Sequence, residues 1–525
     1  MLLKKLLKCL SEYSLKGSLN SEIASITEDS RKVVNKSLFV AIKGIRKDGH
    51  SFIAEAIENG AKVVVVEKMP VKKKRGVTYI KVRNSRKSLG LLAAEFYRNP
   101  STKIKVIGVT GTDGKTTTAA LIHHILETSA KKCGLITTIA AKIDGKEIDT
   151  GLHVTSPDAV KVQSLINEMV EKKCEYAVVE VTSHALDQER FFGIYFDCAV
   201  LTNITHEHLD YHKDFTSYRE AKMKLFENAL SYVVINKDDP SYEYILKRVT
   251  KSTDILFYSL SDKDVTIYAH NLNILETENN FEVIEGVNSY ILTSNLPGEY
   301  NVSNILAAIT CVRAYGIDYD SIKKALSTFK APKGRLEEIK NQRGYKIYVD
   351  FAHTPNSLEK VLTYLRMRLV SENPNGKLIA VFGCAGERDE LKRPLMGEIS
   401  TNIADISIFT TEDPRSEDVN KIISQMEKGT LKTVSKNIGI NNYHATVRGS
   451  NVNNKTRNYY FIIPERGEAI AFAIQKLARK GDIVVVCGKG HEQSMAYNSV
   501  EYDWSDEEAV KLALKGDVKE ITRSN

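Results

Sequence analysis

Short runs of apolar residues alternate with amphipathic stretches along most of the chain. Apolar runs at 37–42 and 61–67 predict buried strands, and the pattern of 89–97 predicts a helix that ends before Asn99-Pro100. Nearly continuous apolar strands separated by helices predict parallel sheets with both faces covered, so the expected fold class is α/β. Further strands are expected at 105–109, 176–180, 198–203, 232–236, 346–350, 377–382, 406–410 and 482–487.

Two breaks in this pattern divide the chain. Asn99-Pro100 marks the first, because the residue before proline is disfavoured in a helix, and the Pro- and Gly-containing segment 330–334 marks the second. We therefore predict three α/β domains, at residues 1–98, 99–331 and 332–525.

Some segments depart from the alternation of strands and helices. Residues 253–295 are strand-rich, and helices return at 301–329. The first ten residues predict a short amphipathic helix. Residues 436–458 are rich in Asn, Lys and Gly with little hydrophobic periodicity, which predicts a surface loop.

The composition limits the classes of protein that fit. A length of 525 residues suits about three domains. The net charge of +8, from 74 basic and 66 acidic residues, is too scattered for a nucleic-acid footprint but suits a polyanionic small substrate. The seven cysteines form no C-x-x-C pair, which argues against a disulfide framework and a zinc ribbon. With no signal-peptide pattern and no run of about 18 apolar residues, we expect a cytoplasmic protein without a membrane span.

The segment 106–118 carries the strongest chemical signal. An apolar strand runs into a glycine turn that opens a helix, where backbone N–H groups bind anionic oxygens. Lys115 can reach the β- and γ-phosphates of a nucleotide, and the Thr116 hydroxyl can ligate Mg²⁺. Val109 stands where the motif G-x-x-x-x-G-K-[ST] has its first glycine, so a simple strand-to-helix turn is the alternative. We predict a nucleotide phosphate site.

Two groups of residues could bind a metal ion. Glu180 ends a strand that we expect beside the phosphate-loop strand, where a carboxylate can hold Mg²⁺, although it could also simply cap the strand. His206, His208 and Asp210 resemble part of the H-x-H-x-D-H run of binuclear zinc hydrolases. A metal-dependent hydrolase, a noncatalytic nucleotide switch and hydrogen-bonded loop histidines therefore stay open at this point.

Three turns that follow strands in the last region mix basic and acidic residues. They are 383–389, 412–415 and 488–492. Such a mixture suits an amino acid: Arg388 or Arg415 could bind its carboxylate, and Glu492 or Asp413 its ammonium. Strand-capping turns with solvated charges are the alternative.

Taken together, these motifs resemble the Mur ligase family, in particular the members that add the third residue to the peptidoglycan stem peptide. The irregular glycine spacing of the phosphate loop is that family's own form. The segments that carry the resemblance are 29–31, 38–41, 110–116, 180–184, 202–212, 301–304, 334–337, 350–355, 383–394, 413–415 and 488–492.

The resemblance implies a specific reaction. ATP would phosphorylate the terminal carboxylate of UDP-N-acetylmuramoyl-L-alanyl-D-glutamate, and an amino group would attack the acyl phosphate. It also implies three domains: an N-terminal domain that binds the UDP precursor, a central P-loop ATPase domain and a C-terminal Rossmann-like domain that binds the amino acid. The protein would be a cytoplasmic monomer that acts in peptidoglycan synthesis. Thr116, Glu180 and His208 would hold Mg²⁺, and Lys222 would be carbamylated to N6-carboxylysine. The catalytic residues would be Lys115, Glu180, His208 and Lys222.

Binding residues also follow from the resemblance. The chain has Thr155-Ser-Pro157 and Thr182-Ser-His184 where relatives usually have Thr-Thr-Pro and Ser-Ser-His, and both changes keep a hydroxyl. The residues implied for ATP are Gly111, Thr112, Asp113, Gly114, Lys115, Thr116, Thr117, Asn301, Arg335 and Asp350. Those implied for the UDP precursor are Ser30, Thr155, Ser156, Thr182, Gln188 and Arg190.

The expected amino acid depends on one motif. Members that use meso-diaminopimelate carry Asp-Asn-Pro-Arg, and this chain has Glu412-Asp-Pro-Arg415. Arg415 favours meso-diaminopimelate, because a guanidinium pairs with a second carboxylate and repels the side-chain ammonium of lysine. The added negative charge of Glu-Asp leaves L-lysine and L-ornithine as alternatives. The implied pocket is Arg388, Glu412, Asp413, Pro414, Arg415, Gly488 and Glu492.

Overall fold

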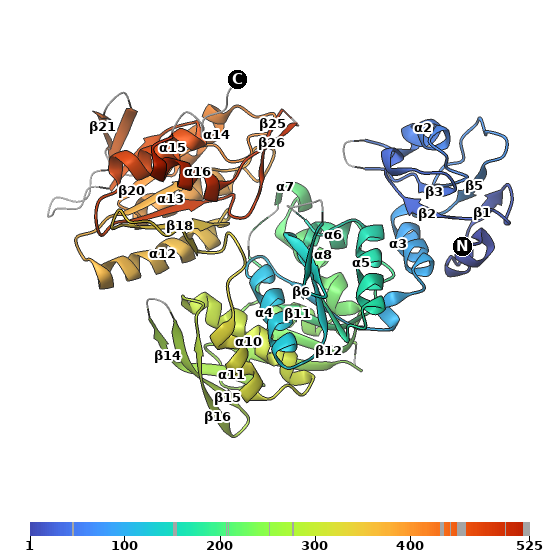
Figure 1. The fold of residues 1–525 in the computed structure, drawn as a ribbon, viewed down its shortest axis with the longest axis horizontal. Helices are drawn as coiled ribbons and strands as arrows, with labels where there is room; N and C mark the ends of the chain where they lie inside the picture. Colours follow the sequence, from blue (N-terminus) through green and yellow to red (C-terminus); the bar gives the residue numbers. More distant parts are fainter. Residues whose placement is uncertain are drawn as a thin grey trace.

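Within the residues that the structure describes, the strands form sheets of five, eleven, eight and two strands. In Figure 1 the five-stranded sheet (blue) and the eight-stranded sheet (orange to red) lie on either side of the eleven-stranded one. The three-domain α/β architecture that the sequence predicts is therefore present. The computed structural model describes residues 1–44, 47–150, 155–205, 207, 209–250, 252–275, 278–430, 435–440, 443–448, 458–498 and 500–517.

The N-terminal sheet has the strand order β1-β5-β4-β3-β2, and only β1 with β5 is antiparallel. Alternate valines of β4 pack into apolar clusters on opposite faces, which explains the unbroken apolar run at 61–67. The predicted first helix is present but short. The elements are α1 (Leu3–Leu6), β1 (Ser14–Lys16), β2 (Ser25–Thr27), β3 (Ser37–Val40), α2 (Ile53–Glu58), β4 (Val63–Val66), β5 (Thr78–Lys81) and α3 (Ser85–Phe96).

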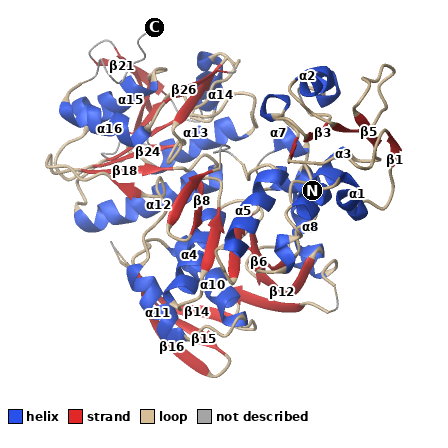
Figure 2. Ribbon diagram, turned by 45° about the vertical axis from the view of Figure 1, so that its right-hand side comes forward, coloured by secondary structure: helices blue, strands red, loops and turns tan. Residues whose placement is uncertain are grey.

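The central sheet places the phosphate-loop strand β6 (Lys105–Thr110) between β10 (Tyr176–Glu180) and β11 (Phe196–Leu201), all parallel. Ile107 packs with residues of α4 and α10 on one face, and Val106 packs with residues of α5 and α8 on the other. Figure 2 shows these helices beside the strands. The helices are α4 (Lys115–Thr128), α5 (Ala159–Glu171), α6 (Ser183–Asp187), α7 (Leu209–His212), α8 (Phe215–Glu227), α9 (Tyr242–Leu246), α10 (Glu299–Ala314) and α11 (Tyr319–Thr328).

The predicted parallel pairing is present at the centre of this domain, and the edges lie in segments for which the sequence predicted no pairing direction. There, hairpins add antiparallel strands on both sides. Short turns between successive strands permit only antiparallel pairing, because a parallel pair needs a longer crossover. The other strands are β7 (Cys133–Ile136), β8 (Ala140–Ile143), β9 (Lys146–Asp149), β12 (Ala229–Asn236), β13 (Asp254–Ser259), β14 (Ile267–Ile274), β15 (Asn279–Glu285) and β16 (Asn288–Ser294).

The C-terminal sheet has the order β17-β18-β24-β19-β20-β23-β22-β21, with parallel pairing from β18 to β23. Apolar clusters cover both faces. The strands are β17 (Glu337–Glu338), β18 (Lys346–Asp350), β19 (Leu378–Phe382), β20 (Ile406–Phe409), β23 (Asn458–Ile462), β24 (Ile483–Cys487), β25 (Ser494–Tyr497) and β26 (Val500–Asp503). The helices are α12 (Pro355–Glu372), α13 (Lys392–Ile403), α14 (Val419–Lys428), α15 (Arg466–Phe472) and α16 (Asp506–Lys515).

The surface loop predicted at 436–458 is largely wrong. Strands β21 (Ser435–Ile440) and β22 (Tyr443–Arg448) form an antiparallel pair, and β22 continues onto β23. Backbone hydrogen bonds build such a ladder even where polar residues hide the two-residue period from sequence inspection. Residues 449–457 lie outside the described part of the chain.

Two further sequence expectations can be compared with the structure. All seven cysteines are free thiols, as the absence of C-x-x-C pairs predicted. Within the described ranges, no helix combines the length and the apolar character that a membrane crossing requires.

Candidate active site

The phosphate loop depends on close packing at its glycines. Gly114 has φ +80°, a left-handed conformation that favours glycine, and a Cβ there would lie 2.1 Å from Asn304 Oδ1. A Cβ on Gly111 would lie 1.8 Å from Thr202 Oγ1. The backbone amide of Asp113 is held by Asn203 Oδ1 at 3.0 Å. The loop therefore reaches the start of α4 in a fixed conformation.

A hydroxyl and a carboxylate meet beside this loop. Thr116 Oγ1 lies 3.0 and 3.1 Å from the two carboxylate oxygens of Glu180, because β10 runs parallel to β6. Thr138 donates its amide and hydroxyl to the same carboxylate, at 3.1 and 3.3 Å. These hard oxygen donors fit Mg²⁺. The structure places Thr116 and Glu180 in contact, and their shared role in binding Mg²⁺ stays a prediction.

Two lysines approach the loop from different elements. Lys115 Nζ donates to Thr112 O at 2.8 Å, and the buried Lys222 of α8 donates to Gly111 O at 2.6 Å. Burial lowers the pKa of both lysines, and the charge of Lys115 lowers that of Lys222 further. The amine of Lys222 is therefore shifted toward its neutral, nucleophilic form.

One cavity brings the phosphate loop together with residues of the C-terminal domain. Arg335 Nη2 lies 3.3 Å from Thr116 Oγ1, and Asn356 Nδ2 lies 2.5 Å from Asp113 Oδ2, so the two domains touch at this site. Chain segments separated by about two hundred residues thus share one space. The predicted residues that line it are Gly111, Thr112, Asp113, Gly114, Lys115, Thr116, Glu180, Thr182, Lys222, Arg335, Arg388, Glu412, Asp413, Arg415, Gly488 and Glu492.

A second cavity adjoins the same loop. It is lined by Thr117, Asn301, Arg335 and Asp350, all predicted to contact ATP, and by Asn304. Asp350 accepts hydrogen bonds from the amides of Leu336 and Ala352 at 2.6 and 2.7 Å, so its carboxylate is fixed. The arrangement leaves room for a nucleoside next to the phosphate site.

A neighbouring lysine pairs with the acidic residue Asp413 of the 412–415 turn. Asp413 Oδ1 accepts from Lys489 Nζ at 2.8 Å and from the amide of Ala496 at 3.0 Å, and Lys489 also pairs with Glu492. The negative charge that Asp413 adds is therefore neutralised by Lys489. The added charge of Asp413 is therefore no longer a reason to expect greater tolerance of lysine.

Two carboxyl groups in the cavity have pKa values close to neutral pH. Burial raises the pKa of Glu412 to about 7 and that of Glu492 to about 7, despite the neighbouring lysines. The Oε2 atom of Glu412 has no hydrogen-bond partner among the described residues. It can therefore accept a bond from a bound ammonium.

Arg415 projects from a turn in which it adopts a left-handed conformation with φ 51°. Its Nη1 donates to Gly386 O at 2.6 Å. Burial lowers the pKa of Arg415, and the nearby cation Arg388 lowers it further. Two guanidinium groups that repel each other in one cavity favour an anionic ligand. Pro414 packs its carbonyl against Gly386, where a Cβ would lie 1.9 Å away.

Most of the residues predicted for the UDP precursor form one hydrogen-bonded group. Thr182 Oγ1 lies 2.9 Å from Thr155 Oγ1 and 3.1 Å from Ser156 Oγ. Arg190 donates to Ser156 O at 2.6 Å and to Gln188 Oε1 at 2.8 Å.

Ser30 lies apart from that group, in the N-terminal domain. It is buried, and its carbonyl accepts from Asn59 Nδ2 at 3.0 Å. Glu28, two residues earlier, interacts electrostatically with Arg190. The segment of Ser30 therefore lies near enough to the central domain for these two charges to interact.

Key residues of the histidine-rich segment 206–212 lie outside the part of the chain that the structure describes. His206 and His208 are not described, nor is the side chain of Asp210. In the described ranges, no group of three or more His, Cys, Asp or Glu residues could hold a metal ion. The metal role of His208 stays a prediction.

Several residues of the site had no role predicted from the sequence. Thr138 fixes Glu180, Lys489 neutralises Asp413, and the buried Lys392 pairs with Glu207 at 3.3 Å across the domains. Lys392 and Lys489 lie inside motifs that the sequence already singled out, at 383–394 and 488–492. Thr138 carried no such signal, because only the fold brings it to Glu180.

Comparison with known proteins supports these observations. Three family profiles match successive parts of the chain: "Mur ligase family, catalytic domain" over residues 22–97, "Mur ligase middle domain" over 109–312 and "Mur ligase, glutamate ligase domain" over 334–490. Together they cover most of the chain and include the phosphate loop and the turns of the cavity.

Relatives and solved structures match along nearly the whole length. UDP-N-acetylmuramoyl-L-alanyl-D-glutamate--2,6-diaminopimelate ligase 1 of Clostridium acetobutylicum is 38% identical over 98% of this chain and 99% of its own. The ligase of the same name from Syntrophomonas wolfei is 38% identical over 99% of this chain and 100% of its own. A solved structure of such a ligase has a TM-score of 0.64 and 27% identity, covering 98% of this chain and 99% of its own.

Proposed function

This chain belongs to the Mur ligase family, and we propose that it is the ATP-dependent ligase that joins meso-diaminopimelate to UDP-N-acetylmuramoyl-L-alanyl-D-glutamate. One observation carries the proposal: a single cavity holds the phosphate loop, Glu180 and the pair Arg388 and Arg415. A phosphate donor and an amino acid with a second carboxylate would meet there. The protein would act in the cytoplasm, as a monomer, in peptidoglycan precursor synthesis.

The proposed reaction activates a carboxylate before the amide bond forms. The terminal carboxylate of the precursor attacks the γ-phosphate of ATP and becomes an acyl phosphate, and ADP leaves. The amine then attacks the carbonyl carbon, and inorganic phosphate departs with the bonding electrons. A free carboxylate is a poor electrophile, so ATP supplies the driving force by creating a good leaving group.

The residues around the phosphate loop would neutralise the charge that builds up when two anions meet. Lys115 would bind the β- and γ-phosphates, and Arg335, 3.3 Å from Thr116 Oγ1, would approach from the C-terminal domain. Thr116 and Glu180, together with His208, would hold Mg²⁺, which when bound supplies further neutralisation of the phosphates. Asn301 and Asp350 line the adjoining cavity and would contact the nucleoside.

Lys222 would act as a carbamate in this reaction. Its buried amine, close to the phosphate loop at Gly111 O, would react with CO₂ and become a carboxylate on a long arm. Such a group would support the binding of metal and phosphate. Thr155, Ser156, Thr182, Gln188, Arg190 and Ser30 would bind the UDP precursor.

The amino acid would be recognised at both of its ends. Arg415 would bind the distal carboxylate of meso-diaminopimelate, with Arg388 nearby, and Glu412 and Glu492 would accept an ammonium group. Because Lys489 pairs with Asp413, the pocket would keep its preference for a side chain that carries a second carboxylate. L-lysine lacks the carboxylate that Arg415 would bind.

The decisive test is substrate-dependent release of phosphate. Purified protein is supplied with ATP, Mg²⁺ and UDP-N-acetylmuramoyl-L-alanyl-D-glutamate, and separately with meso-diaminopimelate, L-lysine or L-ornithine. We expect phosphate and a UDP-tripeptide only when both the precursor and an amino acid are present, with meso-diaminopimelate the best. Turnover without nucleotide, or stronger turnover with lysine, would contradict the proposal.

Arg415→Ala tests the choice of amino acid. The substitution removes a charge-assisted bidentate contact, so we expect kcat/KM for meso-diaminopimelate to fall about tenfold to a hundredfold. Activity with L-lysine should change much less. Equal losses on both substrates would remove the basis for assigning Arg415 to the distal carboxylate.

The pH dependence of substrate binding tests the two carboxyl groups. Because the pKa values of Glu412 and Glu492 are raised to about 7, both groups are mainly protonated below pH 7 and ionised above it. Only the ionised form attracts an ammonium, so KM for meso-diaminopimelate should fall roughly fivefold to tenfold from pH 6 to pH 8. In Glu412→Gln this dependence should be weaker, and an unchanged profile would exclude Glu412 from binding.

A further inference from the structure

Two turns of the C-terminal domain pack directly on each other beside the cavity. They are the 385–388 turn, which contains Arg388, and the 413–416 turn, which contains Arg415. A Cβ on Gly386 would lie 1.9 Å from the carbonyl oxygen of Pro414, so the two backbones are in contact. Arg415 Nη1 also donates to Gly386 O at 2.6 Å. The position of the Arg415 guanidinium therefore depends on where the 385–388 turn lies.

Each turn contains a residue in a left-handed conformation. Glu387 has φ 52° and Arg415 has φ 51°. A residue with a side chain adopts this conformation at an energetic cost, and it persists where surrounding contacts hold it. Backbone hydrogen bonds hold part of this arrangement: the Arg415 amide donates to Ala496 O at 3.0 Å, and the Gly386 amide donates to Asp413 O at 2.7 Å. A side-chain pair beside the turns adds further contacts.

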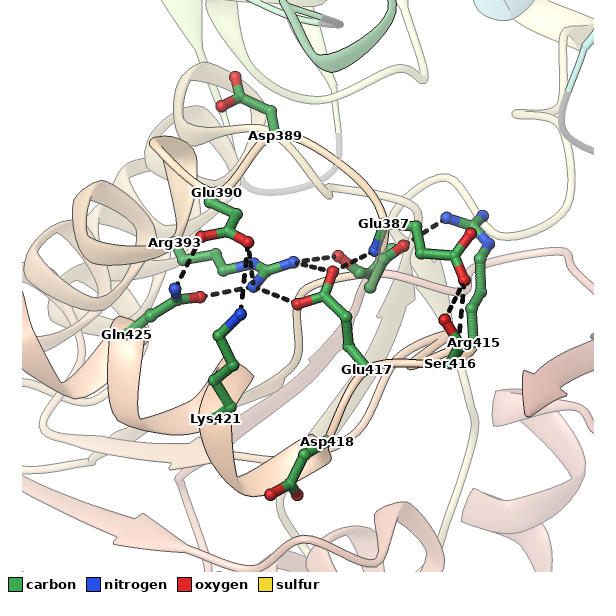
Figure 3. Close-up of polar contacts among 12 residues, drawn as sticks. Glu387, Asp389, Glu390, Arg393, Arg415, Ser416, Glu417, Asp418, Lys421 and Gln425 are labelled. Atoms are coloured by element: carbon green, nitrogen blue, oxygen red, sulfur yellow. Dashed lines mark hydrogen bonds and ion pairs between the residues drawn. The ribbon is translucent and has the colours of Figure 1, made fainter. Parts of the chain in front are cut away.

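That pair is Arg393 of α13 and Glu417, which follows the 413–416 turn. Arg393 is fully buried, and its Nη1 and Nη2 lie 3.0 Å from the two carboxylate oxygens of Glu417. The same guanidinium donates to Ala385 O at 3.2 Å and to Gln425 Oε1 at 2.5 Å. Figure 3 shows this guanidinium between Glu417 and Gln425. Arg393 thus joins both turns to helices of the domain.

Glu417 also forms a hydrogen bond with Glu387, one of the two residues in the left-handed conformation. Its carboxylate accepts a hydrogen bond from the amide of Glu387, and the Glu387 carboxylate accepts from the amide and hydroxyl of Ser416, at 3.2 and 2.6 Å. The contact with Arg393 holds the pKa of Glu417 below its usual value, so the pair stays charged at neutral pH. These bonds connect the two turns next to Arg415, and Figure 3 shows Glu387, Ser416 and Glu417 in this network.

We propose that Arg393 and Glu417 are positioning residues that hold Arg415 where it binds the second carboxylate of the incoming amino acid. They thereby favour amino acids with that carboxylate over those without it. The inference rests on the proposed function, because it assumes that Arg415 contacts an amino-acid substrate. Neither residue lines the cavity among the residues described there, so both act through the two turns.

Glu417→Gln tests this inference with little change in shape. The substitution removes the charge that pairs with Arg393 and replaces one acceptor oxygen by a donor, which weakens the charge-assisted bonds. We expect KM for meso-diaminopimelate to rise about tenfold to a hundredfold, KM for L-lysine to change less than about threefold, and KM for ATP to stay constant. Arg393→Lys keeps the charge but loses the planar fork, so it should act in the same direction.

A second arginine–glutamate pair of the same domain, which does not line the cavity, provides a control. Arg368 Nε lies 2.6 Å from Glu372 Oε1 within α12, and the side chains are 7% and 20% exposed, against 0% and 16% for Arg393 and Glu417. Glu372→Gln should lower Tm about as much as Glu417→Gln but leave the ratio of the two amino-acid KM values unchanged. A purely structural role would give both variants the same result.

The possible results distinguish a failure of the proposed function from a failure of the positioning role of Arg393 and Glu417. Wild-type protein that ligates no amino acid would overturn the proposed function, and this inference with it. Wild-type ligation combined with equal effects of Glu417→Gln on meso-diaminopimelate and L-lysine would overturn the positioning role alone. The same holds if Glu372→Gln changes the selectivity as much as Glu417→Gln does.

Discussion

Replacing Lys115 by alanine is expected to lower kcat/KM for ligation at least about 1000-fold, which corresponds to about 4 kcal/mol of transition-state stabilisation. Lys115 opens α4 at the end of the phosphate loop, where Nζ donates to Thr112 O at 2.8 Å. It would exchange this contact for the β- and γ-phosphates of ATP. Without Lys115, the site would lose the main protein cation that offsets the negative charge of the two reacting anions. The measurement is phosphate release under saturating amino acid and precursor.

Lys131→Ala serves as the control for this substitution. Lys131 belongs to the same domain but lies at the surface, where Nζ pairs with Glu175 at 3.3 Å. Its removal should change kcat/KM less than about twofold, because an exposed ion pair contributes little. If Lys115→Ala turns over like wild type, the acyl-phosphate mechanism is wrong.

Replacing Lys222 by alanine is expected to lower kcat about 100-fold to 1000-fold, with little change in KM for the precursor. The buried amine, shifted toward its neutral form, can attack CO₂ to give a carbamate and a released proton. Burial favours this reaction because only the neutral amine has a free electron pair. Protein prepared without CO₂ should be similarly inactive, and bicarbonate should restore it.

A labelled carbon atom makes the modification directly observable. Wild-type protein in ¹³C-bicarbonate should give a carbamate signal in the NMR spectrum, and Lys222→Ala should not. Lys224→Ala, two residues further along α8, is the control: its Nζ pairs with Glu189 at 2.8 Å at a partly exposed position. A bicarbonate requirement that survives in Lys222→Ala would place the carbamate elsewhere.

Both large predictions concern residues that the sequence had already named, and the reason is physical. The strand, glycine turn and helix of the phosphate loop are consecutive in the chain, so their residue types reveal the conformation locally. Glu180 ends β10, and β10 does pair with β6. Lys222, by contrast, stood in an ordinary amphipathic pattern, and only the resemblance to Mur ligases gave it a role.

The errors of the sequence analysis have a common cause. The hairpin of β21 and β22 was expected to be a loop, and the antiparallel edges of the central sheet were not foreseen. Edge strands are held largely by backbone hydrogen bonds, so their side chains need not follow a clear apolar period. Where both faces of a strand are buried, as in β4 and β10, the apolar run is continuous and the prediction is correct.

The sequence by itself determined the α/β class and the phosphate loop, because each depends on residues close together in the chain. Other residues of the cavity, such as Lys222 and Arg335, were identified only through the resemblance to Mur ligases. Only the tertiary structure decided how they combine. It brings Arg335 to Thr116, pairs Asp413 with Lys489 and places the buried Arg393 in contact with Ala385 and Glu417, beside the turns of Arg388 and Arg415. These contacts join distant segments, and their geometry is set by how the sheets and helices pack, which no local pattern of residues records.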